Sequence, residues 1–257
     1  MTIIQTPDST IYKTPGYLQT TGAIAAGAGT GYLVKQIGNP LFRRIKNFEL
    51  KEYKNSDYSF MKSMVEEAVT ESGMREKGVK SACWTISKAG FASKSNTVFV
   101  NYEKSAYSVF HELGHAINFH NSSFWKTIQK AKPLCRKALP VPFVIALFKR
   151  KKVEGEEPSG FLDKTTTFIK NNAGKLTFTI FLPVIAEELT ATIKGNRLAK
   201  RMLGLNNYNK VFKINALGTS TYLIYGLLSG IAAYAGLKIR DALSVPKTLT
   251  PNNHNIS

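Results

Sequence analysis

The stretch Ser105–Asn121 reads SAYSVFHELGHAINFHN and has the motif HELGH at its centre, at positions 111–115. Apolar residues recur here at helical spacing, and Ser105 stands where the N-cap of a helix is expected. The stretch therefore predicts a helix. Two histidines four residues apart project from one helix face and can hold one metal ion. A glutamate beside the first histidine can take a proton from a water on that metal. The spacing predicts a zinc site with His111 and His115 as ligands and Glu112 as the general base.

The composition makes a membrane surface the expected partner. Lys and Arg number 35 against 17 Asp and Glu, a formal net charge of +18. The basic clusters flank apolar runs, where anionic lipid attracts them; they are Lys35–Lys54, Lys149–Lys152 and Lys194–Lys213. No nucleic-acid signature interleaves aromatic residues with them, so we expect no nucleic-acid partner. Cys83 and Cys135, far apart in the chain, indicate plain thiols rather than a disulfide scaffold.

Two uncharged runs predict transmembrane helices. Thr14–Val34 and Ile214–Leu237 contain 21 and 24 residues, and a span needs about 20. A glycine-rich soluble loop is the alternative for the first run. Gly226 and Gly230 suit close helix pairing, and hence a helix-mediated oligomer. Because basic residues prefer the cytoplasmic side, the clusters predict that HELGH lies on the cytoplasmic face. We expect an integral protein of the bacterial inner (cytoplasmic) membrane.

The segments around HELGH predict an α+β domain that is mainly helical. Asp57–Lys77 has the spacing of an amphipathic helix with a methionine stripe in the core. Val79–Ser87 and Asn96–Asn101 are β-type runs, separated by a loop that contains Gly90. Asn96–Asn101 is either an edge strand that pairs with an extended substrate or an ordinary core strand.

Later segments leave one alternative open. Ala138–Phe148 and Leu176–Ala186 are apolar runs of 11 residues, short for a span, so 138–186 is either a membrane-dipping hairpin or soluble core. Val184–Leu203 predicts a helix. We therefore divide the chain into an N-terminal transmembrane helix with its flank (1–38), a catalytic domain (39–213), and a C-terminal transmembrane helix with a polar tail (214–257).

A catalytic zinc usually has a third protein ligand. Asn118 and Asn121 stand where the extended pattern H-E-x-x-H-x-x-G-x-x-H needs Gly and His, which excludes the metzincin arrangement. His120, five residues after His115, points off the metal face of the helix. The remaining acidic candidates are Glu187 and Glu188.

With this acidic pair the chain resembles the membrane-embedded gluzincins, the group of the CAAX prenyl proteases and the heat-shock membrane endopeptidases. Those proteins combine a HELGH-like helix with a later helix of pattern E-x-x-A-D that supplies a glutamate ligand. Glu188 and Ala191 match this pattern, while Thr192 stands where an aspartate commonly supports the ligands. The resemblance covers about 96–199. It implies a zincin-like metallopeptidase domain with transmembrane helices and Glu188 as the third zinc ligand. Glu187 is the reserve, since adjacent helix residues point about 100° apart.

These observations together predict an integral-membrane, zinc-dependent metalloendopeptidase that acts on a protein or peptide substrate. The alternative is a non-catalytic membrane assembly protein in which HELGH is a structural or degenerate metal site.

Overall fold

The computed structural model describes residues 57–83, 89–149, 151–152 and 157–242, with positions 11–12, 21–22, 24–25, 36, 39–40, 43 and 246–247 near the ends. The chain forms two compact units. Unit 1 comprises Met1–Val34, Leu139–Phe178 and Leu228–Ser257, and unit 2 comprises Lys35–Ala138 and Thr179–Leu227. HELGH and both candidate glutamates lie in unit 2.

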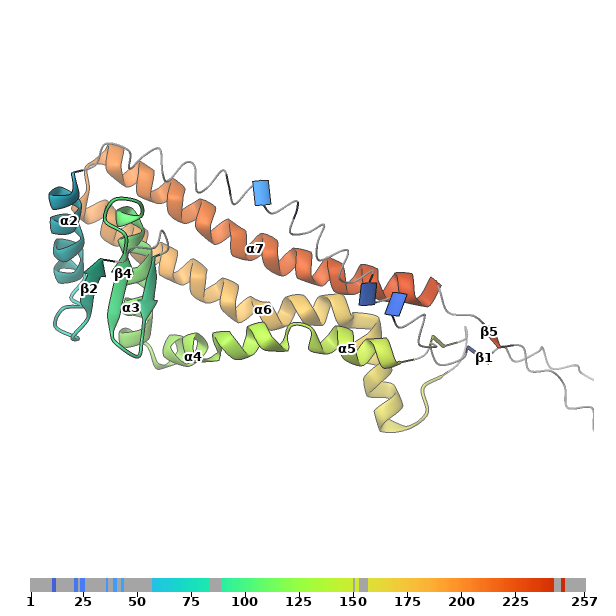
Figure 1. The fold of residues 1–257 in the computed structure, drawn as a ribbon. Helices are drawn as coiled ribbons and strands as arrows, with labels where there is room; N and C mark the ends of the chain where they lie inside the picture. The colour runs from blue at the N-terminus through green and yellow to red at the C-terminus, as the bar shows by residue number, and fades with distance from the viewer. Residues whose placement is uncertain are drawn as a thin grey trace, which may run out of the picture. The chain divides into compact units, whose positions relative to one another are not determined.

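Unit 2 contains a small sheet among helices (Figure 1). Its complete elements are α2 (Tyr58–Glu71), β2 (Lys80–Cys83), β3 (Gly90–Ala92), β4 (Thr97–Val100), the 3-10 turn η1 (Ala106–Ser108), α3 (Val109–Asn121) and α4 (Ser123–Ala138). It also takes in the C-terminal part of α6 (Gly160–Met202) and the N-terminal part of α7 (Leu205–Ala242). The described chain is thus mostly helical with a three-stranded sheet, which confirms the α+β, mainly helical prediction at that level.

The sheet has the order β2-β4-β3, so β4 is its central strand. It runs parallel to β2, with Lys80 opposite Thr97, and antiparallel to β3, with Phe91 opposite Val98. The hypothesis that Asn96–Asn101 is an edge strand open to a substrate is therefore wrong, since both sides of β4 are already paired. The segment predicted as a loop around Gly90 is the strand that closes one side.

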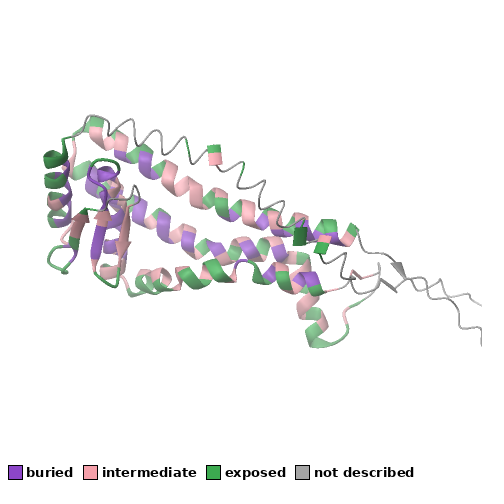
Figure 2. Ribbon diagram, viewed as in Figure 1, coloured by how far each residue is buried: buried purple, intermediate pink, exposed green. Residues whose placement is uncertain are grey.

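The core of unit 2 lies between α2, the sheet and α3 (Figure 2). Met61 and Met64 of α2 are buried there, which confirms the methionine stripe as core. Residues from the other elements complete the cluster, among them Val98 and Val100 of β4, Phe110 and Leu113 of α3, and Leu198 of α6. The sheet and α2 thereby support the inner side of α3.

Helix α3 begins later than its sequence predicts. Ser105 precedes η1, and α3 itself begins at Val109 without a side-chain cap. The Ser105 hydroxyl instead accepts a hydrogen bond from the backbone N–H of Asn101, at 3.1 Å. This fixes the turn between β4 and η1.

Helices α6 and α7 contain 43 and 38 residues. The sequence predicts Leu176–Ala186 as a separate short element. In the structure this run is the middle of α6, which continues through Pro183. Among the described residues, α6 and α7 are the two helices long and apolar enough to cross a membrane. The predicted span Thr14–Val34 and the tail from Ser244 lie almost entirely outside the described residues.

Unit 1 is built on α5 (Val141–Phe148) and on the remaining parts of α6 and α7. Gly174 and Gly230 let α6 and α7 touch: a Cβ added at Gly230 would lie 2.8 Å from the Gly174 carbonyl oxygen. The fully buried Arg240 donates to the carbonyl oxygens of Ala146 and Leu147, at 2.6 and 2.8 Å, at the end of α5. Near the chain ends, β1 (Ile11–Tyr12) pairs antiparallel with β5 (Pro246–Lys247).

Candidate metal centre

Glycines bring α3 and α6 into backbone contact. A Cβ added at Gly114 would lie 2.0 Å from the carbonyl oxygen of Ala191, and one added at Gly195 would lie 2.2 Å from that of Phe110. Each helix therefore presents a glycine to the backbone of the other. Of the two roles that a glycine in HELGH could have, close helix packing or room for a metal, the structure shows close packing. This crossing delivers the two glutamates of α6 to the histidines of α3.

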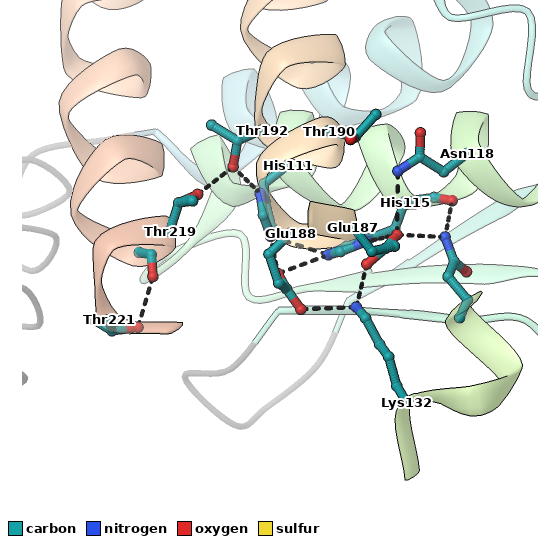
Figure 3. Close-up of polar contacts among 12 residues, drawn as sticks. His111, His115, Asn118, Lys132, Glu187, Glu188, Thr190, Thr192, Thr219 and Thr221 are labelled. Atoms are coloured by element: carbon teal, nitrogen blue, oxygen red, sulfur yellow. Dashed lines mark hydrogen bonds and ion pairs between the residues drawn. The ribbon is translucent and has the colours of Figure 1, made fainter. Parts of the chain in front are cut away.

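Three candidate ligand atoms meet at the crossing (Figure 3). Nε2 of His111 lies 3.1 Å from Nε2 of His115, and Oε2 of Glu188 lies 3.2 and 3.3 Å from these two nitrogens. The three residues are the group that could hold a metal ion among the described residues. Their side chains are 16%, 10% and 3% exposed, so the site is largely closed to water.

The spacing of these atoms fits a tetrahedral metal. Bonds of about 2.0–2.1 Å to a tetrahedral zinc place its ligand atoms about 3.3 Å apart. If both Nε2 atoms were unprotonated, their lone pairs would repel each other at this separation, and a cation between them would remove that repulsion. The donor set of two imidazoles and one carboxylate is one that zinc accepts, with one position left for water.

The other ring nitrogen of each histidine has a hydrogen-bonding partner. Nδ1 of His115 donates to Oε1 of Glu187 at 2.7 Å, and Nδ1 of His111 lies within hydrogen-bonding distance of the Thr192 hydroxyl, at 3.0 Å. The Thr192 hydroxyl is in turn 2.5 Å from that of Thr219. With a proton on both Nδ1 atoms, both Nε2 lone pairs would be available to a metal. Thr192, where the resembled family commonly has aspartate, therefore still supports a candidate ligand.

Glu187 lies outside the group of three candidate ligands and hydrogen-bonds to one of them. Its Oε1 accepts from His115 and also from Asn118 and Gln129, at 3.2 and 2.7 Å. Its side chain is fully buried, and the Lys132 ammonium ion-pairs with its other oxygen. The same ammonium lies 2.8 Å from Oε1 of Glu188. Sequence reasoning missed Gln129 and Lys132, because polar and basic residues on an exposed amphipathic helix usually face solvent.

The electrostatic balance favours a cation between the ligands. Burial by itself lowers the pKa of His115, but its interactions with Glu187 and Glu188 outweigh burial and raise that pKa from 6.5 to about 9. At neutral pH and without metal, the His115 imidazole therefore carries a proton on each of its two nitrogens. A metal ion held by the three candidate ligand atoms would take the place of the Nε2 proton and would face the same carboxylates.

Two further side chains border the site. Glu112 is 8% exposed and lies on α3 between the two histidines in sequence. Tyr222 of α7 interacts with Glu188 and lies near Glu112, and no sequence pattern singles it out. His120, in contrast, turns away from the metal position, as expected, and contacts Oδ1 of Asn96 at 2.8 Å.

No family model, curated protein or solved structure matches this chain. The functional assignment therefore depends on the geometry of the three converging ligand atoms and the groups around them.

Proposed function

We propose that the chain is an integral-membrane, zinc-dependent metalloendopeptidase of the gluzincin type, with a zincin-like catalytic domain. The observation that carries the proposal is the convergence of His111, His115 and Glu188 within 3.3 Å of one another, with both imidazoles oriented by hydrogen bonds at Nδ1. A water-activating glutamate, Glu112, adjoins the first ligand in the sequence. These are the parts that metal-assisted peptide hydrolysis needs.

In this mechanism His111, His115 and Glu188 would hold Zn²⁺, which would supply Lewis-acid chemistry to a water and to the scissile carbonyl. Glu112 would take a proton from the attacking water and pass it to the leaving amine. Glu187 and Thr192 keep the imidazoles in the tautomer that binds metal. The Tyr222 hydroxyl, near Glu112 and Glu188, is a hydrogen-bond donor on the α7 side of the site.

The exposure of α6 and α7 supports membrane insertion. Only 39% and 28% of their most apolar windows are buried, whereas the core helix of a soluble protein is mostly buried. Large apolar side chains remain exposed along α7, among them Leu223, Leu227 and Ile231 at 44–55%. A surface of this kind needs an apolar environment. The alternative of glycine-driven assembly loses support, because Gly230 already packs against Gly174 within the chain.

Metal content and proteolysis test the enzyme proposal separately. Protein purified in detergent or nanodiscs should carry about one zinc per chain. His111→Ala should lose zinc and activity together, whereas Glu112→Gln should keep the zinc and lose hydrolysis of a quenched-fluorescence peptide library. If wild type and Glu112→Gln both bind zinc and neither hydrolyses any peptide, the result would contradict the enzyme and favour the non-catalytic alternative.

Orientation is the second part of the proposal, with the metal centre on the cytoplasmic side of the membrane. Cys83 is an exposed thiol at the end of β2, in the same unit as the site. With Cys135→Ser removing the other thiol, an impermeant maleimide should label Cys83 in inverted vesicles but not in intact cells. Labelling from outside intact cells would contradict this orientation.

A further inference from the structure

Lys132 holds a position that zinc ligation alone does not require. It reaches from α4 to both glutamates, and its side chain is only 17% exposed. No residue of α4 is buried overall, so the backbone of this helix stays at the surface while Lys132 extends inward. Gln129, three residues earlier, donates from its amide to the His115 carbonyl oxygen and to Glu187, both at 2.7 Å, and ties α4 to the site.

The lysine and the histidines use different oxygens of Glu188. Oε1 lies 2.8 Å from the Lys132 ammonium, whereas Oε2 faces the two Nε2 atoms at 3.2 and 3.3 Å. The same division holds at Glu187, where Oε1 meets His115 and the other oxygen meets Lys132. The ammonium therefore occupies the carboxylate edges that point away from the imidazoles.

A carboxylate beside a metal can bind through one oxygen or through both. Two imidazoles and one oxygen leave a tetrahedral site with one open position, and a second oxygen from the same carboxylate would compete for it. Resting on the proposed function, we infer that Lys132 is a positioning residue that restricts Glu188 to one ligand oxygen. It thereby keeps a coordination position free for water.

The charge of Lys132 predicts the direction in which its removal changes the metal affinity. Lys132 is a positive charge beside a position for a divalent cation, so it does not increase metal affinity by attraction. Removing it frees Oε1 and removes a repulsion, so zinc should bind as tightly as before or more tightly. A lysine that merely stabilised the site would have the opposite effect, because its loss would leave two adjacent buried carboxylates unpaired and would weaken the site.

The experiment compares three variants on α4 in the full-length membrane protein. Lys132→Met removes the charge at similar length, and Lys132→Arg retains it. Lys130→Met is the matched control, since Lys130 is exposed on the same helix. Each protein is loaded with Co²⁺ for visible absorption spectra and with Zn²⁺ for affinity, X-ray absorption and peptide hydrolysis.

We expect Lys132→Met to retain one metal per chain with unchanged or higher affinity. Its Co²⁺ absorption should weaken as coordination rises, its zinc should gain an oxygen neighbour, and kcat should fall about 10–100-fold with little change in KM. Lys132→Arg and Lys130→Met should keep the wild-type spectrum.

Loss of metal from Lys132→Met, or a wild-type spectrum and kcat in that variant, would overturn the inference and leave the proposed function standing. Lower thermal stability with an unchanged spectrum would also overturn it, because it would show a purely structural role. A wild-type protein that binds no metal overturns both. A spectral change in a protein without peptidase activity supports the inference about Glu188 and counts against the enzyme.

Discussion

The α3–α6 crossing can be tested by adding one methyl group at Gly114. A Cβ there would lie 2.0 Å from the Ala191 carbonyl oxygen and 2.6 Å from its carbon, whereas real Cβ contacts essentially never fall below 3.0 Å. Gly114→Ala must therefore separate the helices locally by at least about 1 Å. Metal–ligand distances tolerate only about 0.2 Å, so Glu188 would no longer reach a metal held by His111 and His115.

We expect Gly114→Ala to lower zinc affinity at least about 100-fold, because losing a ligand costs at least as much as losing a supporting residue. Overpacking should also lower the free energy of unfolding by about 1–3 kcal/mol. Competition titration with a chromophoric chelator measures the affinity, and circular dichroism with thermal unfolding confirms that the variant folds.

Two further variants separate the crossing from a general effect of alanine. Gly195→Ala, whose Cβ would lie 2.2 Å from the Phe110 carbonyl oxygen, should behave as Gly114→Ala does. Gly218→Ala is the control, because nothing lies within 4 Å of its added Cβ and alanine favours a helix. Wild-type zinc affinity in a folded Gly114→Ala protein would refute the close contact between α3 and α6.

Three other outcomes follow from the same contacts. Glu188→Gln should abolish stoichiometric zinc binding, whereas Glu187→Gln should bind zinc about 10–100-fold more weakly, as expected for a supporting residue; equal losses in the two would contradict their different roles. Thr192→Val should lower zinc affinity about 10-fold by freeing the His111 ring, and Thr192→Ser, which retains the hydroxyl, should not. Arg240→Met should lower the free energy of unfolding by about 3 kcal/mol or more, because two buried carbonyl oxygens lose their donor. Its zinc affinity should match wild type, since the site and Arg240 belong to different units.

The histidine pair could be predicted from sequence because the geometry of one helix decides it. His111 and His115 are four residues apart, and any α-helix over HELGH brings them to one face. The glutamate required more than local geometry, since 77 residues separate it from His111. The pattern of the family that the chain resembles favoured Glu188 over Glu187, and the crossing at Ala191 shows why a small residue suits the position three residues later.

The sheet shows where local patterns were insufficient. β4 has a clear β-type sequence, but its central position depends on β3, a strand of 3 residues that contains a glycine. So short a segment has no periodicity to detect, and the pairing that closes that side of β4 is decided by long-range contacts. The order of strands therefore came only from the structure.

The local sequence patterns of α6 and of the α4 residues that contact the site were misleading. Pro183 and the change from polar to apolar residues suggested separate elements, yet α6 continues through both. A proline removes one helical hydrogen bond, and packing on neighbouring helices can compensate for that loss. Lys132 lies among other basic residues of α4, and only the position of Glu187 and Glu188 distinguishes it.

Anomalous diffraction at the zinc absorption edge, from crystals of the metal-loaded full-length protein, tests the central claim most directly. We expect a single peak per chain at about 2.0–2.2 Å from Nε2 of His111, Nε2 of His115 and Oε2 of Glu188, and no such peak in Glu188→Gln. A peak away from these three atoms, or one that persists in Glu188→Gln, would contradict it.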